Sequence, residues 1–177
     1  MAFRVQHRVG VAAPASALWA VVSDLQGWGT WNPLFPEAEG RLSIGALLTL
    51  RRELDGKSEG HEVRIVDWVP NAQIVWARSI APFARSLGYI EIEALTERGC
   101  ILSAGELYQG ALGELIGKRV RPTLRHGFAA LCEAAKARAE STWDGVPDEP
   151  VPPPPPPAPV KQRSAMMQMS LRGGGKR

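Results

Sequence analysis

The sequence predicts an α+β domain made of an antiparallel sheet and one long helix. Between Gly40 and Gln109, β-type runs alternate with turn residues, and no helical stretch is long enough for a parallel crossover. After Gly110 the apolar period becomes helical. After Trp143 prolines replace the apolar residues of a core. We therefore expect one domain at residues 1–143 and a disordered, proline-rich, basic tail at 144–177.

The first elements follow from two different apolar periods. Residues 3–11 alternate apolar and polar side chains, which is typical of a half-buried strand. Pro14 suits the first turn of a helix, and near-helical apolar spacing continues to about Asp24. The glycines of the following GWGTWNPLFP segment then break regular structure. This segment is predicted to be a loop with at most one short helical turn.

Five further strands are predicted from the β-type runs. Turn residues separate them, including Asp55-Gly56-Lys57 and Glu97-Arg98-Gly99. The expected strands span residues 46–54, 61–69, 73–80, 86–95 and 100–109. Because short turns join successive runs, the strands should form an antiparallel meander.

The long helix carries its apolar residues on one stripe. Leu124, Phe128, Leu131 and Ala135 fall at helical spacing. Pro122 either starts this helix or kinks it after a preceding segment at 112–120. From 122 to 140 it would be about 28 Å long. A helix of that length can cross a whole sheet.

Charge and cysteine content exclude several classes of function. The net charge is +3, but residues before Asp144 hold 16 basic and 15 acidic side chains, so the domain carries only +1. This balance gives no reason to expect nucleic acid as a partner. Cys100 and Cys132 stand far apart with no histidine at metal-ligand spacing, so we expect reduced thiols, no metal and no cofactor. Without a signal-like or bilayer-spanning apolar run, we expect no transmembrane segment and a cytoplasmic protein.

Three stretches together resemble a known superfamily. They are APASALWAVVSDLQGWGTWNP at 13–33, VDWVPNAQIVW at 66–76 and GELYQGALGELIGKRVRPTLRHGFAALCEAAKARAE at 105–140. With the strand order, they resemble the START-like (SRPBCC) superfamily, in particular its polyketide cyclase/dehydrase and lipid-transport-like branch. The Trp-Asn-Pro at 31–33 is the most specific part of the match. The resemblance implies a helix-grip fold, in which a curved sheet wraps the long helix around a cavity for hydrophobic molecules.

Physical reasoning also favours such a cavity, because one helix cannot fill the concave face of a strongly curved sheet without bulky side chains or a guest. The helix face of Leu124, Phe128 and Leu131 would cover the cavity. Trp31 would lie at its rim and Trp76 on its wall. Which strand face points inward is left open by the sequence, since several runs are apolar on both faces.

Two polar side chains could orient a ligand. Arg78 lies two residues after Trp76 in the same strand, so both side chains can point to the same face of the sheet. If that face is buried, the guanidinium needs an anionic ligand or a carboxylate partner. The candidate partners are Glu91, Glu93 and Glu106. The alternative is an arginine that is exposed or paired at the rim, since antiparallel sheets commonly expose one face. Tyr89 could present its hydroxyl to a ligand or only pack.

The leading hypothesis for function is the binding of a hydrophobic small molecule or lipid in this cavity. A first alternative is a polyketide cyclase/dehydratase-type enzyme, but Tyr89, Glu106 and Arg78 form no recognisable catalytic constellation. No histidine pairs with a cysteine in the sequence pattern, so no catalytic residue is assigned. A second alternative is an interaction protein whose proline-rich tail binds a protein partner.

Overall fold

A computed structural model describes residues 2–110 and 112–150. Its elements in chain order are the strand β1 (Ala2–Val11), the helix α1 (Ala15–Ser23), the 3-10 helix η1 (Leu25–Thr30), the strands β2 (Glu37–Gly40), β3 (Leu47–Leu54), β4 (Lys57–Val69), β5 (Gln73–Ala81), β6 (Ala84–Thr96) and β7 (Gly99–Gly110), and the helix α2 (Gly113–Thr142). The predicted α+β class is confirmed.

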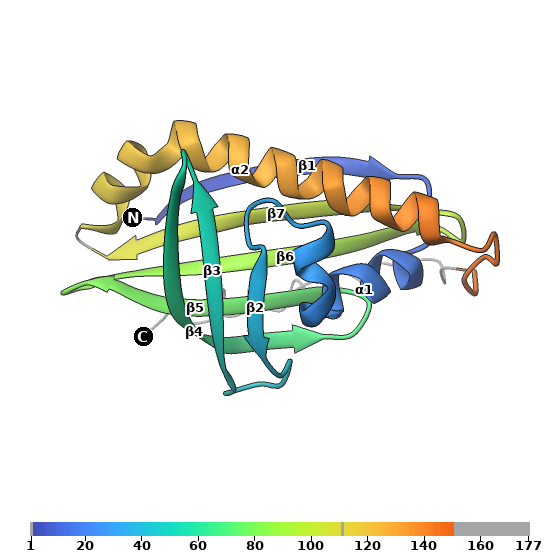
Figure 1. The fold of residues 1–177 in the computed structure, drawn as a ribbon, viewed down its shortest axis with the longest axis horizontal. Coiled ribbons are helices and arrows are strands. Elements are labelled where there is room, and N and C mark those ends of the chain that lie inside the picture. Colours follow the sequence, from blue (N-terminus) through green and yellow to red (C-terminus); the bar gives the residue numbers. More distant parts are fainter. Residues whose placement is uncertain (1, 111, 151–177) are drawn as a thin grey trace, which may run out of the picture.

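The strands form one antiparallel sheet in the order β1-β7-β6-β5-β4-β3-β2. Strands β3 to β7 are the predicted meander. The last strand, β7, also pairs with the first strand, β1, along almost its whole length. The sheet curves, and α2 lies along its concave face while α1 and η1 cover one end (Figure 1). This arrangement is the helix-grip fold that the resemblance implied.

The core lies between the sheet and the helices. Strand residues with alternating burial, such as Ile65, Ile74 and Leu102, meet Leu131 of α2 and Leu18 of α1 in one buried apolar cluster. The stripe predicted for the long helix is buried along its length. Strand periodicity and helix periodicity therefore converge on the same core.

Helix α2 contains Pro122 in its interior. This proline therefore does not start the helix, and the segment expected at 112–120 belongs to the same helix as the residues after Pro122. Proline has no N–H for the carbonyl of Lys118, four residues earlier. Lys118 is exposed, so water can satisfy that carbonyl.

Strand β2 was not predicted. It holds only four residues, three of them exposed, and pairs with β3 at the edge of the sheet. So short a strand carries almost no periodic signal. Strand β4 also begins four residues earlier than expected, because the β3–β4 hairpin pairs right up to Leu54 and Lys57.

The chain continues to contact the domain beyond Trp143. Asp148 accepts hydrogen bonds from the backbone N–H and the hydroxyl of Ser16 in the first turn of α1. The Asp148 N–H donates to the carbonyl of Glu97 at 2.9 Å. Contacts thus extend five residues past the predicted domain boundary, and most of the predicted tail lies outside the described residues. No helix in the described part of the chain is long and apolar enough to cross a membrane.

Candidate functional site

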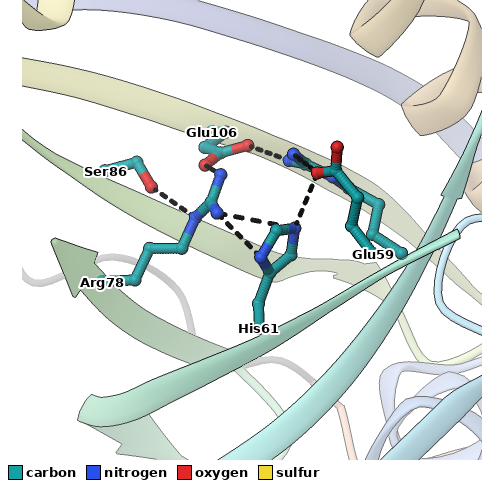
Figure 2. Close-up of polar contacts among 6 residues, drawn as sticks. Glu59, His61, Arg78, Ser86 and Glu106 are labelled. Carbon is teal, nitrogen blue, oxygen red and sulfur yellow. Dashed lines mark hydrogen bonds and ion pairs between the residues drawn. The ribbon is translucent and has the colours of Figure 1, made fainter. Parts of the chain in front are cut away.

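Polar side chains gather at one end of the otherwise apolar concave face. They come from the ends of strands near the β3–β4 and β5–β6 hairpins, and the cavity beside them is lined on α2 by Phe128, near the middle of the helix. Figure 2 shows them converging, with Glu106 and Ser86 on one side and His61 and Glu59 on the other. The complete polar cluster is Arg52, Glu59, His61, Arg78, Ser86 and Glu106.

Strand alternation places these residues inward. On β3, Arg52 continues the inward series of Leu48 and Leu50. On β4, His61 precedes the buried Val63 in the same parity. In both β3 and β4, the inward-facing series thus changes from apolar to polar residues near the same end of the sheet.

Two arginines share one buried carboxylate. Arg52 Nη1 lies 3.4 Å from Glu106 Oε2, and Arg78 Nη2 lies 3.6 Å from Glu106 Oε1. The side chain of Glu106 is 6% exposed, and those of Arg52 and Arg78 are 12% and 16% exposed. Arg78 Nε also donates to Ser86 Oγ at 3.3 Å. Glu106 was one of the three partners expected for a buried Arg78, and the exposed alternative for Arg78 does not hold.

The cluster carries more positive than negative charge at its centre. Glu106 is matched against two guanidinium groups, and Glu59, 3.6 Å from Arg52, is exposed at the rim. Buried charges are stable only when they are paired. Within the buried centre, the two guanidiniums thus have one carboxylate, and the second carboxylate of the cluster is the exposed Glu59.

His61 is uncharged at neutral pH. Burial, together with the positive charges of Arg78 and Arg52, lowers its pKa from 6.5 to about 4. Arg78 Nη1 lies 3.0 Å from His61 Nδ1. The same Nη1 lies 3.4 Å from His61 Nε2, so the guanidinium lies over the face of the imidazole ring. Nε2 is also 3.6 Å from Glu59 Oε2.

A small cavity lies beside this polar cluster. Its lining residues are Phe35, Leu50, Arg52, His61, Val63, Trp76, Arg78, Gly88, Glu106 and Phe128. The cavity volume is about 10 Å³, which corresponds to roughly one water molecule. A Cβ at Gly88 would lie 2.3 Å from Trp76 Nε1, so only glycine allows the indole to lie flat against β6. Aromatic rings therefore fill most of the space beside the charged groups.

Of the residues expected to bind a ligand, the structure brings Trp76, Arg78 and Phe128 together on this cavity. Leu124 and Leu131 are fully buried on the same face of α2 but line the core and not the cavity. Trp31 packs edge-on against Trp28 in the η1 region, with ring centroids 6.2 Å apart, and does not line the cavity either.

Tyr89 lies on the opposite face of the sheet from the cavity. It follows Gly88, whose position faces inward, and its hydroxyl donates to Gln6 Oε1 at 2.8 Å. The guanidinium of Arg4 lies over its ring. Burial raises the pKa of Tyr89, which stabilises the neutral phenol as a packing group. In this arrangement Tyr89 does not contact a ligand in the cavity.

Sequence reasoning missed Arg52 and assigned no catalytic role to any histidine, His61 included. The signal for both was parity, since each continues an alternating apolar series in its strand. Parity alone did not say which face was concave. Only the pairing of β3 with β4 and β4 with β5 brings them beside Arg78.

The cysteines contribute nothing to the site. Cys100 and Cys132 are both free and fully buried away from the polar cluster. Burial raises the pKa of Cys100 to about 11 and that of Cys132 to about 12. The stretches 2–110 and 112–150 hold no group of three or more residues suited to binding a metal ion.

The sequence profile of the family described as "Polyketide cyclase / dehydrase and lipid transport" matches residues 2–143. The chain therefore belongs to that family. No curated protein matches the chain.

Solved structures share the fold at low identity. An aromatase/cyclase, Zhui, from Streptomyces sp. R1128 superposes with a TM-score of 0.64 at 20% identity, covering 79% of this chain and 94% of that chain. A START superfamily protein from Mycobacterium smegmatis gives 0.63 at 22%, covering 78% and 97%. Norcoclaurine synthase from Thalictrum flavum, in complex with dopamine and hydroxybenzaldehyde, gives 0.61 at 14%, covering 81% and 89%. At these identities the likeness shows the fold alone.

Proposed function

We propose that this member of the family binds an amphipathic small molecule with an anionic group. The apolar part of the ligand lies between the sheet and α2, and its anionic group lies between Arg52 and Arg78. The observation that carries this proposal is the pair of nearly buried guanidiniums that shares the single carboxylate of Glu106 at the edge of an apolar cavity. An anionic ligand would supply the missing negative charge.

The contact distances support a ligand with planar acceptor oxygens. The two arginine contacts to Glu106 are 3.4 and 3.6 Å, whereas optimal charge-assisted hydrogen bonds measure about 2.7–2.9 Å. Both guanidiniums thus keep donors that Glu106 does not fully use. A carboxylate accepts such donors in a fork-like arrangement, and a phenolate or enolate accepts them through one oxygen.

Ligand binding must enlarge the cavity. About 10 Å³ is far less than the roughly 300–1,000 Å³ of typical ligand pockets. The contact between α2 and Leu54 of the β3–β4 hairpin is a suitable place to open, because the ends of the Leu34 and Leu54 side chains pack there against Gly127, which has no side chain. Rotation of Phe128 would add further space next to Arg52.

Calorimetric titration with matched amphiphiles tests the proposal. Each pair has the same aliphatic or aromatic body and ends either in a carboxylate or in an alcohol. The carboxylate should bind about ten-fold or more tightly, because it accepts charge-assisted hydrogen bonds. The variant Arg52→Gln should lose this preference, as should Arg78→Gln.

Arg51→Gln is the matched control. Arg51 adjoins Arg52 but points to the other face, where it pairs with Glu37 at the surface. It should retain the full preference for the carboxylate. Equal affinity for acid and alcohol in the unmodified protein, or a loss of the preference in Arg51→Gln as large as that in Arg52→Gln, would contradict the proposal.

A second candidate is a cyclase or dehydratase-type enzyme, favoured by the neutral imidazole of His61 next to the arginine pair. In that case the arginines would stabilise negative charge developing on a carbonyl oxygen, and His61 would accept a proton from the adjacent carbon. Norcoclaurine synthase and the aromatase/cyclase show that this fold also occurs in enzymes.

Turnover of a short poly-β-ketothioester, followed by the absorbance of its aromatic product, tests this candidate. His61→Gln should reduce the rate about 100-fold or more, the usual contribution of a general base. Carboxylate binding should be retained in the same variant. If the unmodified protein converts the substrate no faster than buffer alone, the enzyme candidate is contradicted and ligand binding remains the proposed function.

A further inference from the structure

Large apolar side chains protrude at the end of the molecule that contains the β5–β6 hairpin and the start of α2. Phe83, at the tip of the hairpin, is 90% exposed, and Leu115, in the first turn of α2, is 68% exposed. Leu112, directly before α2, is also exposed. Figure 1 shows the hairpin tip and the first turn of α2 at the same end of the molecule.

Backbone pairing fixes this arrangement. Ala84 pairs with Gly110 at the end of the sheet. A Cβ at Gly110, where φ is +97°, would lie 2.0 Å from the carbonyl oxygen of Phe83, so glycine is required for the close approach. Leu112 follows two residues later and Leu115 one helical turn after it. The three apolar residues therefore protrude from two neighbouring backbone segments; we call them the apolar tip.

The segments that carry the apolar tip are rich in basic side chains. Residues 113–126 of α2 carry one acid, Glu114, against four exposed basic residues, Lys118, Arg119, Arg121 and Arg125. Arg85 adds a fifth positive charge next to Phe83 on the hairpin. In contrast, the rest of α2 carries Glu133 and Glu140 against Lys136 and Arg138 and is neutral. The positive charge of the long helix is thus confined to the end near the apolar tip.

Acidic residues of the β3–β4 hairpin lie elsewhere along the helix. That hairpin contains Glu53 and Asp55, and its Leu54 meets α2 at Gly127, well beyond the first turns. These acids therefore flank the middle of α2. They do not neutralise the first turns, next to Leu115.

We propose that the apolar tip docks on the surface of an anionic lipid bilayer. Phe83 and Leu115 would enter the headgroup region, and the surrounding lysine and arginine side chains would contact anionic headgroups. A soft interface fits a single aromatic side chain at the tip of a turn, whereas a protein partner would have to supply a matching pocket. The inference is independent of which ligand the cavity binds, but it would bring the polar end of the cavity close to a membrane.

Vesicle sedimentation with the full chain tests the charge and apolar requirements together. The protein should bind phosphatidylcholine vesicles that contain phosphatidylserine and remain free of vesicles of phosphatidylcholine alone. The double variant Phe83→Glu, Leu115→Glu should bind about ten-fold or more weakly, because it loses buried apolar area and adds repulsion. Ile44→Glu is the control, since Ile44 is 67% exposed in the loop before β3.

A fluorescent probe distinguishes insertion of the tip from binding through another part of the chain. Phe83→Cys and Ile44→Cys are labelled separately with an environment-sensitive dye; the native Cys100 and Cys132 are buried and should not react. With phosphatidylserine vesicles, emission should shift to the blue at position 83 and stay unchanged at 44. No vesicle binding, or equal responses at both positions, would overturn the proposal, and binding only to an acidic protein would assign the tip to a protein partner.

Discussion

The two halves of the concave face are built by the same strands but differ in what α2 covers. Under its second half, strand residues such as Ile65, Ile74 and Leu102 are apolar and fully buried. Toward the other end of the face, next to Phe128 of α2, the same inward parity carries Arg52 and Arg78 beside Glu106. Identical alternation thus produces a closed core at one end and a charged cavity at the other.

The difference shows how one scaffold separates stability from binding. The apolar half buries side chains at high packing density, where loss of a methylene group costs stability directly. The polar half retains excess positive charge that the protein itself does not fully neutralise. We expect substitutions in the apolar half to act mainly on unfolding and those in the polar half mainly on ligand affinity.

The largest effect on stability is expected at Leu131, in the apolar half. Leu131→Ala should reduce the free energy of unfolding by about 3 kcal/mol, because the fully buried side chain leaves a cavity. Urea denaturation measures this loss. Leu115→Ala, at an exposed position of the same helix, should change stability by less than about 0.5 kcal/mol. Similar losses in both variants would show that the second half of α2 does not form the core.

Glu106→Gln should separate stability from ligand affinity most sharply, because the two should change in opposite directions. Removal of the carboxylate leaves two guanidiniums without their shared partner, so stability should fall by about 2 kcal/mol. Affinity for a carboxylate amphiphile should instead increase about ten-fold, because the internal competitor for the arginines is gone. Glu93→Gln, which removes a surface partner of Arg8, is the control for both measurements. Weaker ligand binding by Glu106→Gln would contradict the assignment of the anion site.

His61 should make stability depend on pH. Its pKa is lowered to about 4 in the folded state, from 6.5 in an unfolded chain. Between these values the unfolded chain binds a proton that the folded protein does not, so stability should fall as pH drops from about 6.5 to 4. His61→Gln should flatten this part of the profile, measured by thermal unfolding. His126→Gln, at an exposed helix position, should leave it unchanged.

The smallest effect is expected where the chain leaves the domain. Asp148 accepts the backbone N–H of Ser16 at 3.1 Å and caps the first turn of α1. Asp148→Ala should cost about 1 kcal/mol, the usual value of a helix cap. Glu149→Ala is the neighbouring control, and ligand affinity should remain unchanged in both variants. A change in carboxylate binding would mean that the two ends of the molecule are coupled.

Elements were predicted correctly from the sequence where the run of residues was long enough to show the period of a strand or a helix. Strand β1 and the buried stripe of α2 were evident from alternation and helical spacing. The four-residue β2 was missed because it is too short to show a period. The sequence did not decide whether the helix continues through Pro122, because this depends on tertiary packing. The part of α2 before Pro122 packs on the sheet where Gly117 meets Phe3 and Tyr108.

The candidate site was predicted in part, for a physical reason. Arg78 and Glu106 were both considered as a buried pair, because an inward charge requires a partner. Arg52 was not, since its place beside Glu106 depends on strand curvature across the sheet and not on local alternation. Tyr89 was expected to be able to reach a ligand, but its parity places it on the outer face with Gln6.

The most direct test of the anion site is the pKa of a bound carboxylate. A ligand labelled with carbon-13 at its carboxyl group is titrated by NMR, free and in complex with the protein. Held between Arg52 and Arg78, its pKa should fall well below the value in water, because nearby positive charges favour the ionised form. An unchanged or raised pKa would show that the carboxyl group lies in an apolar environment away from the arginines, and would contradict the account.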